Sequence, residues 1–155
     1  MTPPPRPDPR TPSKPIEILL VEDNPDDVEL TVEALADSKV LNRISIARDG
    51  VEAIDFVNKR GQFADAPTPD VILLDLNMPR KSGREVLAEL KADPNHRHIP
   101  IIILTTSSAE EDILRSYKLQ ASAYVVKPVD FNRFVEVVKA IDTFWFNVAS
   151  YPAGK

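Results

Sequence analysis

Short uninterrupted apolar runs alternate along this chain with segments of helical periodicity, and four of these runs end in a polar residue. The four runs are Ile18–Val21, Val71–Leu74, Ile101–Leu104 and Tyr124–Val126. Apolar runs of this length with no polar interruption predict strands that are buried on both faces, as in a parallel sheet. Because apolar residues at helical spacing lie between them, the pattern predicts strands joined by helical crossovers.

Five strands and five helices are expected. The predicted strands are Ile16–Val21, Arg43–Ala47, Val71–Asp75, Ile99–Leu104 and Ala123–Val126. The predicted helix starts are Pro25 after the N-cap Asn24, the capping boxes Asp49/Glu52 and Ser82/Glu85, Ser107 or Ser108 with Glu110 or Glu111, and a position near Asp130. We therefore expect an α/β, doubly wound fold: a five-stranded parallel sheet with helices on both faces and right-handed crossovers.

The two ends of the chain differ from this pattern. Residues 1–14 contain six prolines among polar residues, which favours a disordered or polyproline leader. A solvated tail is a simpler interpretation of this leader than a docking peptide. We expect one domain over residues 15–148 and a tail over residues 149–155. No output domain is expected after Lys155.

Composition excludes several classes of function. The chain has 155 residues, a formal net charge of −5 and no cysteine, which argues against nucleic-acid binding and excludes disulfides and thiolate zinc sites. Its four glycines cannot build a Walker A or a dinucleotide-binding loop. No apolar run approaches the ~18 residues of a membrane span, and the proline-rich start does not resemble a secretory signal. A cytoplasmic protein that binds no membrane is expected.

The residues that follow the strands predict a site. Ligands of open α/β sheets bind outside the carboxyl ends of the strands, where Glu22-Asp23, Asp75, Thr105 and Lys127 are expected to meet. Adjacent acids repel each other unless a cation neutralises them, and carboxylate oxygens are suitable ligands for Mg²⁺. A hydroxyl and a lysine nearby could bind phosphoryl oxygens. The set is suited to the transfer of a phosphoryl group to a carboxylate.

Capping offers a simpler interpretation of two of these acids. Asp75 could be the N-cap of the helix that follows it, although Ser82 is better placed for that role. Asp23 could cap the helix that opens at Pro25, although Asn24 competes for that position. Thr105 alone, or the Lys127-Pro128 pair alone, is a weak signal.

Taken together, these motifs resemble the receiver domains of two-component response regulators, the CheY-like group with a flavodoxin-like (βα)5 fold. The resemblance covers about residues 16–141. It is carried by Glu22-Asp23, by Asp75-Leu76-Asn77-Met78-Pro79, by Thr105, and by Tyr124-Val125-Val126-Lys127-Pro128.

The resemblance implies a role for each matching position. Asp75 would be the phosphoacceptor, and Asp23, Asp75 and the backbone carbonyl of Asn77 would hold Mg²⁺ with indirect help from Glu22. Lys127 and Thr105 would stabilise the phosphoryl group. Thr105 and the aromatic residue Tyr124 would form the switch. The partner would be a sensor histidine kinase, and the protein would be a phosphoacceptor switch rather than a metabolic enzyme.

Two other functions remain open at this point. A haloacid-dehalogenase-type phosphatase also uses an aspartyl phosphate, threonine, lysine and Mg²⁺, but that family has a second aspartate where this chain has Asn77. The second alternative is a scaffold protein that works without phosphorylation. The acidic pair and Asp75 argue against it.

The end of the chain is unusually apolar for a surface helix. The segment from Phe131 to Val148 includes Phe134, Phe144, Trp145 and Phe146, which is a wider apolar face than one sheet contact needs. We expect a homodimer through the fourth helix, fifth strand and fifth helix; the alternative is that the tail folds back on its own domain. Phe144-Trp145-Phe146, residues 59–69 and residues 81–87 also resemble phytochrome-associated single-domain response regulators, which implies a phytochrome-type kinase.

Overall fold

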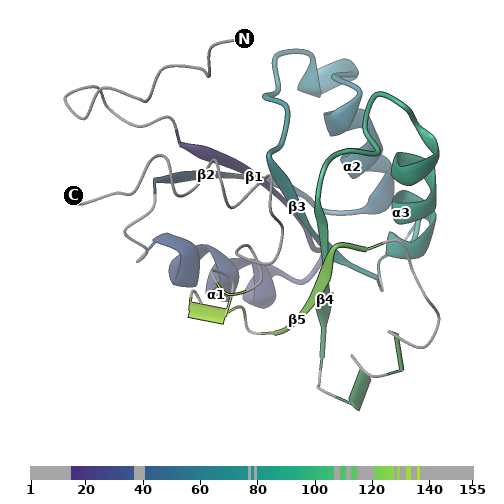
Figure 1. Cartoon of the computed structure of the whole chain (residues 1–155). Helices are drawn as coiled ribbons and strands as arrows, with labels where there is room; N and C mark the ends of the chain where they lie inside the picture. The colour runs from purple at the N-terminus through teal and green to yellow at the C-terminus, as the bar shows by residue number, and fades with distance from the viewer. Residues whose placement is uncertain are drawn as a thin grey trace, which may run out of the picture.

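One parallel sheet of five strands forms the centre of the molecule (Figure 1). The computed structural model describes residues 15–36, 41–76, 78, 80–106, 109–110, 113–114, 121–127, 129, 132–133 and 136. The strands are β1 (Ile16–Val21), β2 (Asn42–Ala47), β3 (Val71–Asp75), β4 (Ile101–Thr105) and β5 (Ala123–Val126). Their order in the sheet is β2-β1-β3-β4-β5, and every neighbouring pair is parallel. The predicted sheet is confirmed, with small shifts at the ends of β2 and β4.

Within the described residues, three helices and one short 3-10 turn are complete between these strands. The helices are α1 (Pro25–Ala36), α2 (Gly50–Val57) and α3 (Gly83–Ala92), and the turn is η1 (Gly61–Phe63). Helix α1 covers one face of the sheet, and α2 and α3 cover the other (Figure 1). The predicted doubly wound arrangement is confirmed. Among the described residues, no helix combines the length and apolarity that crossing a bilayer requires.

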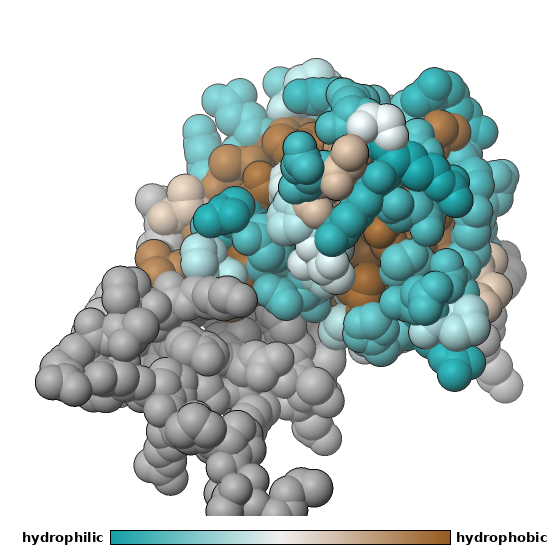
Figure 2. Space-filling view, turned by 90° about the horizontal axis from the view of Figure 1, so that it is seen from above, coloured by the Kyte–Doolittle hydropathy of each residue, from teal (hydrophilic) through white to brown (hydrophobic). Residues whose placement is uncertain are grey.

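Each strand contributes alternate residues to two separate cores. Leu19 and Ile72 pack on the side of α2 and α3, whereas Leu20 and Leu73 pack on the side of α1. All four of these side chains are buried. This explains why the strand sequences are continuous apolar runs rather than alternations of apolar and polar residues. Polar side chains cover most of the described surface in the view of Figure 2, with small apolar patches between them.

The helix starts follow the expected capping chemistry. The Asn24 side chain accepts hydrogen bonds from the backbone N–H groups of Asp26 and Asp27, so Asn24 is the N-cap of α1. Asp49 accepts from the N–H of Glu52 at 2.9 Å. The second half of that predicted box differs, because the Glu52 carboxylate accepts from the N–H of Arg48 instead. Ser82 caps α3 by accepting from the N–H of Glu85.

Several predicted features lie outside the described residues. They are the leader 1–14, the tail 149–155, Asn77, Ser107, Ser108, and the residues Phe134, Phe144, Trp145 and Phe146 of the expected partner surface. Residues 109–110 and 113–114 are helical, as are 132–133 and 136. These positions agree with helices in the predicted fourth and fifth places.

The connection from β3 to α3 is packed tightly against its neighbours at two glycines. A Cβ atom on Gly83 would lie 2.3 Å from the backbone oxygen of Asp75, and one on Gly50 would lie 2.1 Å from the backbone oxygen of Lys81. The Gly83 N–H also donates to the carbonyl of Leu76 at 3.0 Å. The absence of side chains at these glycines therefore lets the backbone that follows Asp75 lie against α3 and α2.

We predict that Gly83→Ala lowers the free energy of unfolding by about 2–3 kcal/mol, because the new methyl group forces the Asp75 backbone to move. Gly61→Ala is the control: nothing lies within 4 Å of its Cβ position, and its φ of +56° costs about 1 kcal/mol. Urea denaturation followed by circular dichroism measures both. An equal or smaller loss in Gly83→Ala would contradict the tight contact.

Candidate functional site

The register of the sheet brings the predicted site residues to one edge. Val21 pairs with Leu74, so the next residues, Glu22 and Asp75, leave neighbouring strands side by side. On the other side of β3, Asp75 pairs with Leu104 and Thr105 pairs with Val126. The Lys127 N–H donates to the carbonyl of Thr105 at 2.7 Å. Residues more than 100 positions apart in the sequence therefore meet at the carboxyl edge of the sheet, as expected for this class of fold.

Three carboxylates form a compact acidic cluster at this edge. Glu22, Asp23 and Asp75 each offer an oxygen atom, and these atoms all lie within 4.8 Å of one another. Glu22 and Asp75 are buried, whereas Asp23 is exposed. Oxygen ligands at this spacing suit a hard divalent cation that retains some of its waters. The predicted ligand Asn77 lies outside the described residues.

Glu22 shows the electrostatic cost of the cluster. Its side chain is 1% exposed, and burial, with added contributions from its contact with Asp75 and the charge of Asp75, raises the pKa of Glu22 to about 7. Hydrogen bonds from Lys127 and from the N–H of Asn24 act in the opposite direction. The folded protein therefore carries an excess of negative charge here that a cation would relieve.

Lys127 is the basic group beside these carboxylates. Its Nζ donates to Glu22 Oε2 at 3.0 Å and to Asp27 Oδ2 at 2.9 Å, and it lies 3.7 Å from Asp75 Oδ2. Burial acts to lower the pKa of Lys127, but the bonds to Asp27 and Glu22 and the charge of Asp75 outweigh it and raise that pKa. The ammonium group is thus held in its charged form.

The capping interpretation of two acids is not supported. Ser82 caps α3 and Asn24 caps α1, so neither Asp75 nor Asp23 is needed for those roles. Asp75 instead lies in the acidic cluster, within ion-pair distance of Lys127. Asp23 completes the same cluster from the exposed side. The structure brings both acids to the predicted site.

Thr105 and Tyr124 lie on the neighbouring strands β4 and β5, where Thr105 pairs with Val126 and Tyr124 pairs with Ile103, and both are buried. The Thr105 hydroxyl donates to the carbonyl of Val125 at 3.5 Å. Tyr124 belongs to the core on the side of α2 and α3, with only 5% of its surface exposed. The aromatic side chain expected to take part in a switch thus occupies an inward position in this structure.

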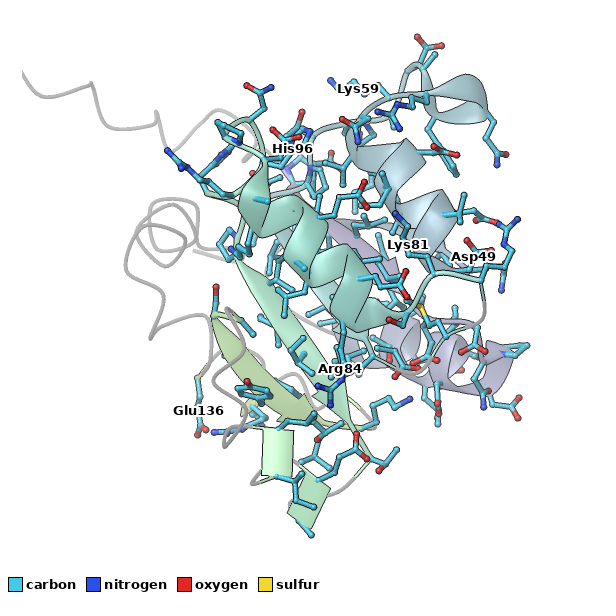
Figure 3. The ribbon with its side chains drawn as sticks, turned by 90° about the vertical axis from the view of Figure 1, so that its right-hand side faces the viewer. Asp49, Lys59, Lys81, Arg84, His96 and Glu136 are labelled. Carbon is cyan, nitrogen blue, oxygen red and sulfur yellow. The ribbon has the colours of Figure 1, made fainter. Side chains whose placement is uncertain are left out.

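Two interactions at the site were not predicted. One is the ion pair between Lys127 and Asp27, in the first turn of α1. The other joins Asp49 to Arg80, whose Nε and guanidinium nitrogen donate to the same carboxylate oxygen at 2.9 and 2.5 Å. Figure 3 shows Asp49 beside Lys81, where the loop after β3 meets the start of α2. Arg80 also has a left-handed φ of 64°. The ion pair and the close glycine contacts together hold this loop in place.

The first signal for Asp27 is its spacing along α1. Residues four apart share a helix face, and Asp27 precedes the buried residues Thr31 and Leu35 by four and eight positions. Asp26 precedes Leu30, which is 47% exposed. Acids in the first turn of a helix are also stabilised by the helix dipole. This general reason for an acid at position 27 does not point to a specific partner. For Arg80 the sequence offers no such signal, because its partner lies 31 residues away.

Comparison with known proteins agrees with this geometry. The model of the response regulator receiver domain matches residues 18–139. Response regulator Rcp1 of Synechocystis sp. is 41% identical over 136 residues, which cover 88% of this chain and 92% of Rcp1. The Mn²⁺-bound structure of Rcp1 has a TM-score of 0.68 and covers 90% of this chain and all of the other.

Two further solved structures are similar. The bacteriophytochrome response regulator AtBRR is 46% identical, with a TM-score of 0.79, and the alignment covers 85% of this chain and 96% of AtBRR. The phosphorylated cyanobacterial phytochrome response regulator RcpA is 45% identical, with a TM-score of 0.67, and covers 86% and 95%. With the sheet order and the acidic site, these matches assign the chain to the family of response regulator receiver domains.

Proposed function

We propose that this protein is a response regulator that accepts a phosphoryl group on Asp75 from a sensor histidine kinase. The observation that carries the proposal is the position of Asp75: a buried carboxylate at a strand end, in an acidic cluster and 3.7 Å from a lysine ammonium. A structural ion pair needs only one acid for one lysine. An acidic cluster with a single lysine is better explained by a site that receives both a cation and a phosphoryl group.

Mg²⁺ is the cation that fits the donor set. Asp23 and Asp75 offer carboxylate oxygens as direct ligands, and Glu22 supports the ion by its charge. The resemblance adds the backbone carbonyl of Asn77. When bound, the ion would offset the negative charge that collects on the phosphoryl oxygens during transfer. The raised pKa of Glu22 is consistent with this fit, because burial and then the neighbouring Asp75 carboxylate disfavour its charged form, which a bound cation would favour.

The protein's own residues would do the rest by placement. A carboxylate oxygen of Asp75 attacks the phosphorus atom of the donor, and the leaving group departs on the opposite side. Lys127 and the Thr105 hydroxyl then bind phosphoryl oxygens. Movement of Thr105 toward the phosphoryl group would change the packing around Tyr124, which lies two positions before the Thr105 partner Val126 on the neighbouring strand, and this would link the chemistry to the surface. Loss of the phosphoryl group by the protein's own hydrolysis would reset the switch.

A phosphatase function is less well supported. The haloacid-dehalogenase-type enzymes have a second aspartate two residues after the nucleophile, where this chain has Asn77. The family match is to a receiver domain, and Rcp1 and AtBRR are named as response regulators. We therefore propose a switch that carries one phosphoryl group, not an enzyme that turns over phosphate esters.

The kinase partner is proposed from the relatives. AtBRR and RcpA are named as response regulators of phytochromes, and each is more than 40% identical to this chain. A phytochrome-type histidine kinase is therefore the donor that we propose for Asp75. The expected cytoplasmic location suits such a kinase and stays a prediction.

A homodimer is proposed from the sequence of the last helix. The segment from Phe131 to Val148 is more apolar than contact with one sheet requires. Its aromatic residues Phe144, Trp145 and Phe146 are outside the described residues. The proposed interface combines the fourth helix, β5 and the fifth helix.

We predict that incubation with acetyl phosphate and Mg²⁺, or with an autophosphorylated phytochrome-type kinase, labels the chain with one phosphoryl group. Asp75→Asn should abolish the label, because an amide cannot form an acyl phosphate. Asp65→Asn, an exposed aspartate in the loop after η1, should leave it unchanged. Phosphate-affinity gel electrophoresis reads out the label. Labelling of Asp75→Asn at the same level as the parent would contradict the assignment of Asp75 as the phosphoacceptor.

We predict that Asp75→Asn raises the free energy of unfolding in metal-free buffer at pH 8, by on the order of 1–2 kcal/mol. The folded pKa of Glu22, about 7, lies above its ordinary 4.5, so the folded state holds more protons and stability falls as pH rises through this window. Removing the Asp75 charge should make that fall smaller. Urea denaturation at pH 5 and pH 8 measures it.

Mg²⁺ provides the second half of this test. It should stabilise the parent chain at pH 8 by mass action, and Asp75→Asn much less, since the variant lacks one ligand. Asp65→Asn should behave as the parent in both buffers. An Asp75→Asn chain that is less stable than the parent without metal would show that the cluster carries no repulsion.

We predict that the intact chain sediments as a dimer and that a chain truncated before Phe144 sediments as a monomer. The physical reason is that the truncation removes Phe144, Trp145 and Phe146, the apolar side chains proposed to contact the second copy. Analytical ultracentrifugation of the two chains at equal concentration measures this. Equal monomer mass for both would rule out the proposed dimer.

A further inference from the structure

Lys127 is shared among three carboxylates, and its bonds are not equal. Nζ lies 2.9 Å from Asp27 and 3.0 Å from Glu22, but 3.7 Å from Asp75. The first two are hydrogen-bond distances, while the third is a charge contact beyond hydrogen-bond length. In this structure the lysine is therefore held nearer to α1 than to the residue that would receive the phosphoryl group.

Asp27 is placed to do this by the geometry of α1. Its side chain is 30% exposed, on the face that continues into the buried residues Thr31 and Leu35. The neighbouring Asp26 is exposed, and its backbone N–H donates to the capping side chain of Asn24. Both acids occupy the first turn of the helix and carry the same charge, yet of these two Asp27 alone forms an ion pair with Lys127.

An ammonium group has three N–H donors. Asp27 and Glu22 occupy two of them at ordinary lengths. When Asp75 receives the phosphoryl group, its charge changes from about −1 to about −2 and it gains strong acceptor oxygens. The Asp27 carboxylate then competes with the phosphoryl oxygens for the ammonium group.

We propose that Asp27 is a positioning residue that holds Lys127 back from Asp75 in the unphosphorylated protein. The inference rests on the proposed function of Asp75. Breaking the Asp27–Lys127 ion pair is then part of the cost of phosphorylation, and Asp27 sets how readily the site accepts the phosphoryl group. Glu22 cannot have the same role, because it is buried in the acidic cluster itself.

The test uses acetyl phosphate with Mg²⁺ and the full chain. In the step, an Asp75 carboxylate oxygen forms a bond to phosphorus, the bond between phosphorus and the acetyl oxygen breaks, and acetate leaves with that electron pair; no proton is transferred. Asp27→Asn should label about fivefold faster than the parent, as expected for loss of one partly exposed ion pair. Asp26→Asn, the matched control, should stay within about twofold.

Lys127→Met shows whether the effect passes through the lysine. In that background, adding Asp27→Asn should leave the labelling rate unchanged, because there is no ammonium to hold back. A gain that persists without Lys127 would mean that Asp27 acts only by repelling the anionic donor, and would overturn the proposal. So would slower labelling of Asp27→Asn, or a gain equal to that of Asp26→Asn.

A metal-free readout separates this inference from the proposed function. In a crystal structure of Asp27→Asn without metal or phosphodonor, Lys127 Nζ should lie within about 3.2 Å of Asp75. An unchanged lysine position would overturn the restraint. If the parent chain takes up no label, the proposed function fails. If the parent is labelled and Asp27→Asn matches its rate, the inference alone fails.

Discussion

The charge of one ammonium group stabilises the carboxyl edge of this sheet. Lys127 Nζ lies within 4 Å of three carboxylates, two of which belong to buried residues. Without this cation, Glu22 and Asp75 would be buried acids side by side, an arrangement that costs several kcal/mol in folded proteins. The excess of acids over bases remains even so, and burial together with the neighbouring Asp75 carboxylate raises the pKa of Glu22. The same excess leaves the site ready for a cation.

The fold makes this charge arrangement tolerable by rigid packing around it. Strands β1, β3 and β4 are buried on both faces, so their ends cannot separate to relieve repulsion. The backbone after Asp75 is held by the close approach of Gly83 and by the Asp49–Arg80 ion pair. The carboxylates therefore stay close together at the strand ends despite their repulsion, in an arrangement that phosphoryl transfer would require.

The family relationship and the site geometry describe different aspects of the protein. The match over residues 18–139 accounts for the sheet, the acidic cluster and the lysine. The contact of Lys127 with Asp27 is a property of this chain's own side chains. It places the lysine between α1 and Asp75, so that the first helix takes part in the electrostatics of the site.

The sequence by itself determined the strands, the N-caps of α1, α2 and α3, and the chemical class of the site. Uninterrupted apolar runs such as Ile101–Leu104 permit little other than buried parallel strands, and parallel strand ends must meet at one edge. Tertiary structure alone decided which carboxylates share Lys127 and how Arg80 reaches Asp49. Those distances depend on how helices pack across gaps of 31 and 100 residues, and no local pattern along the chain encodes them.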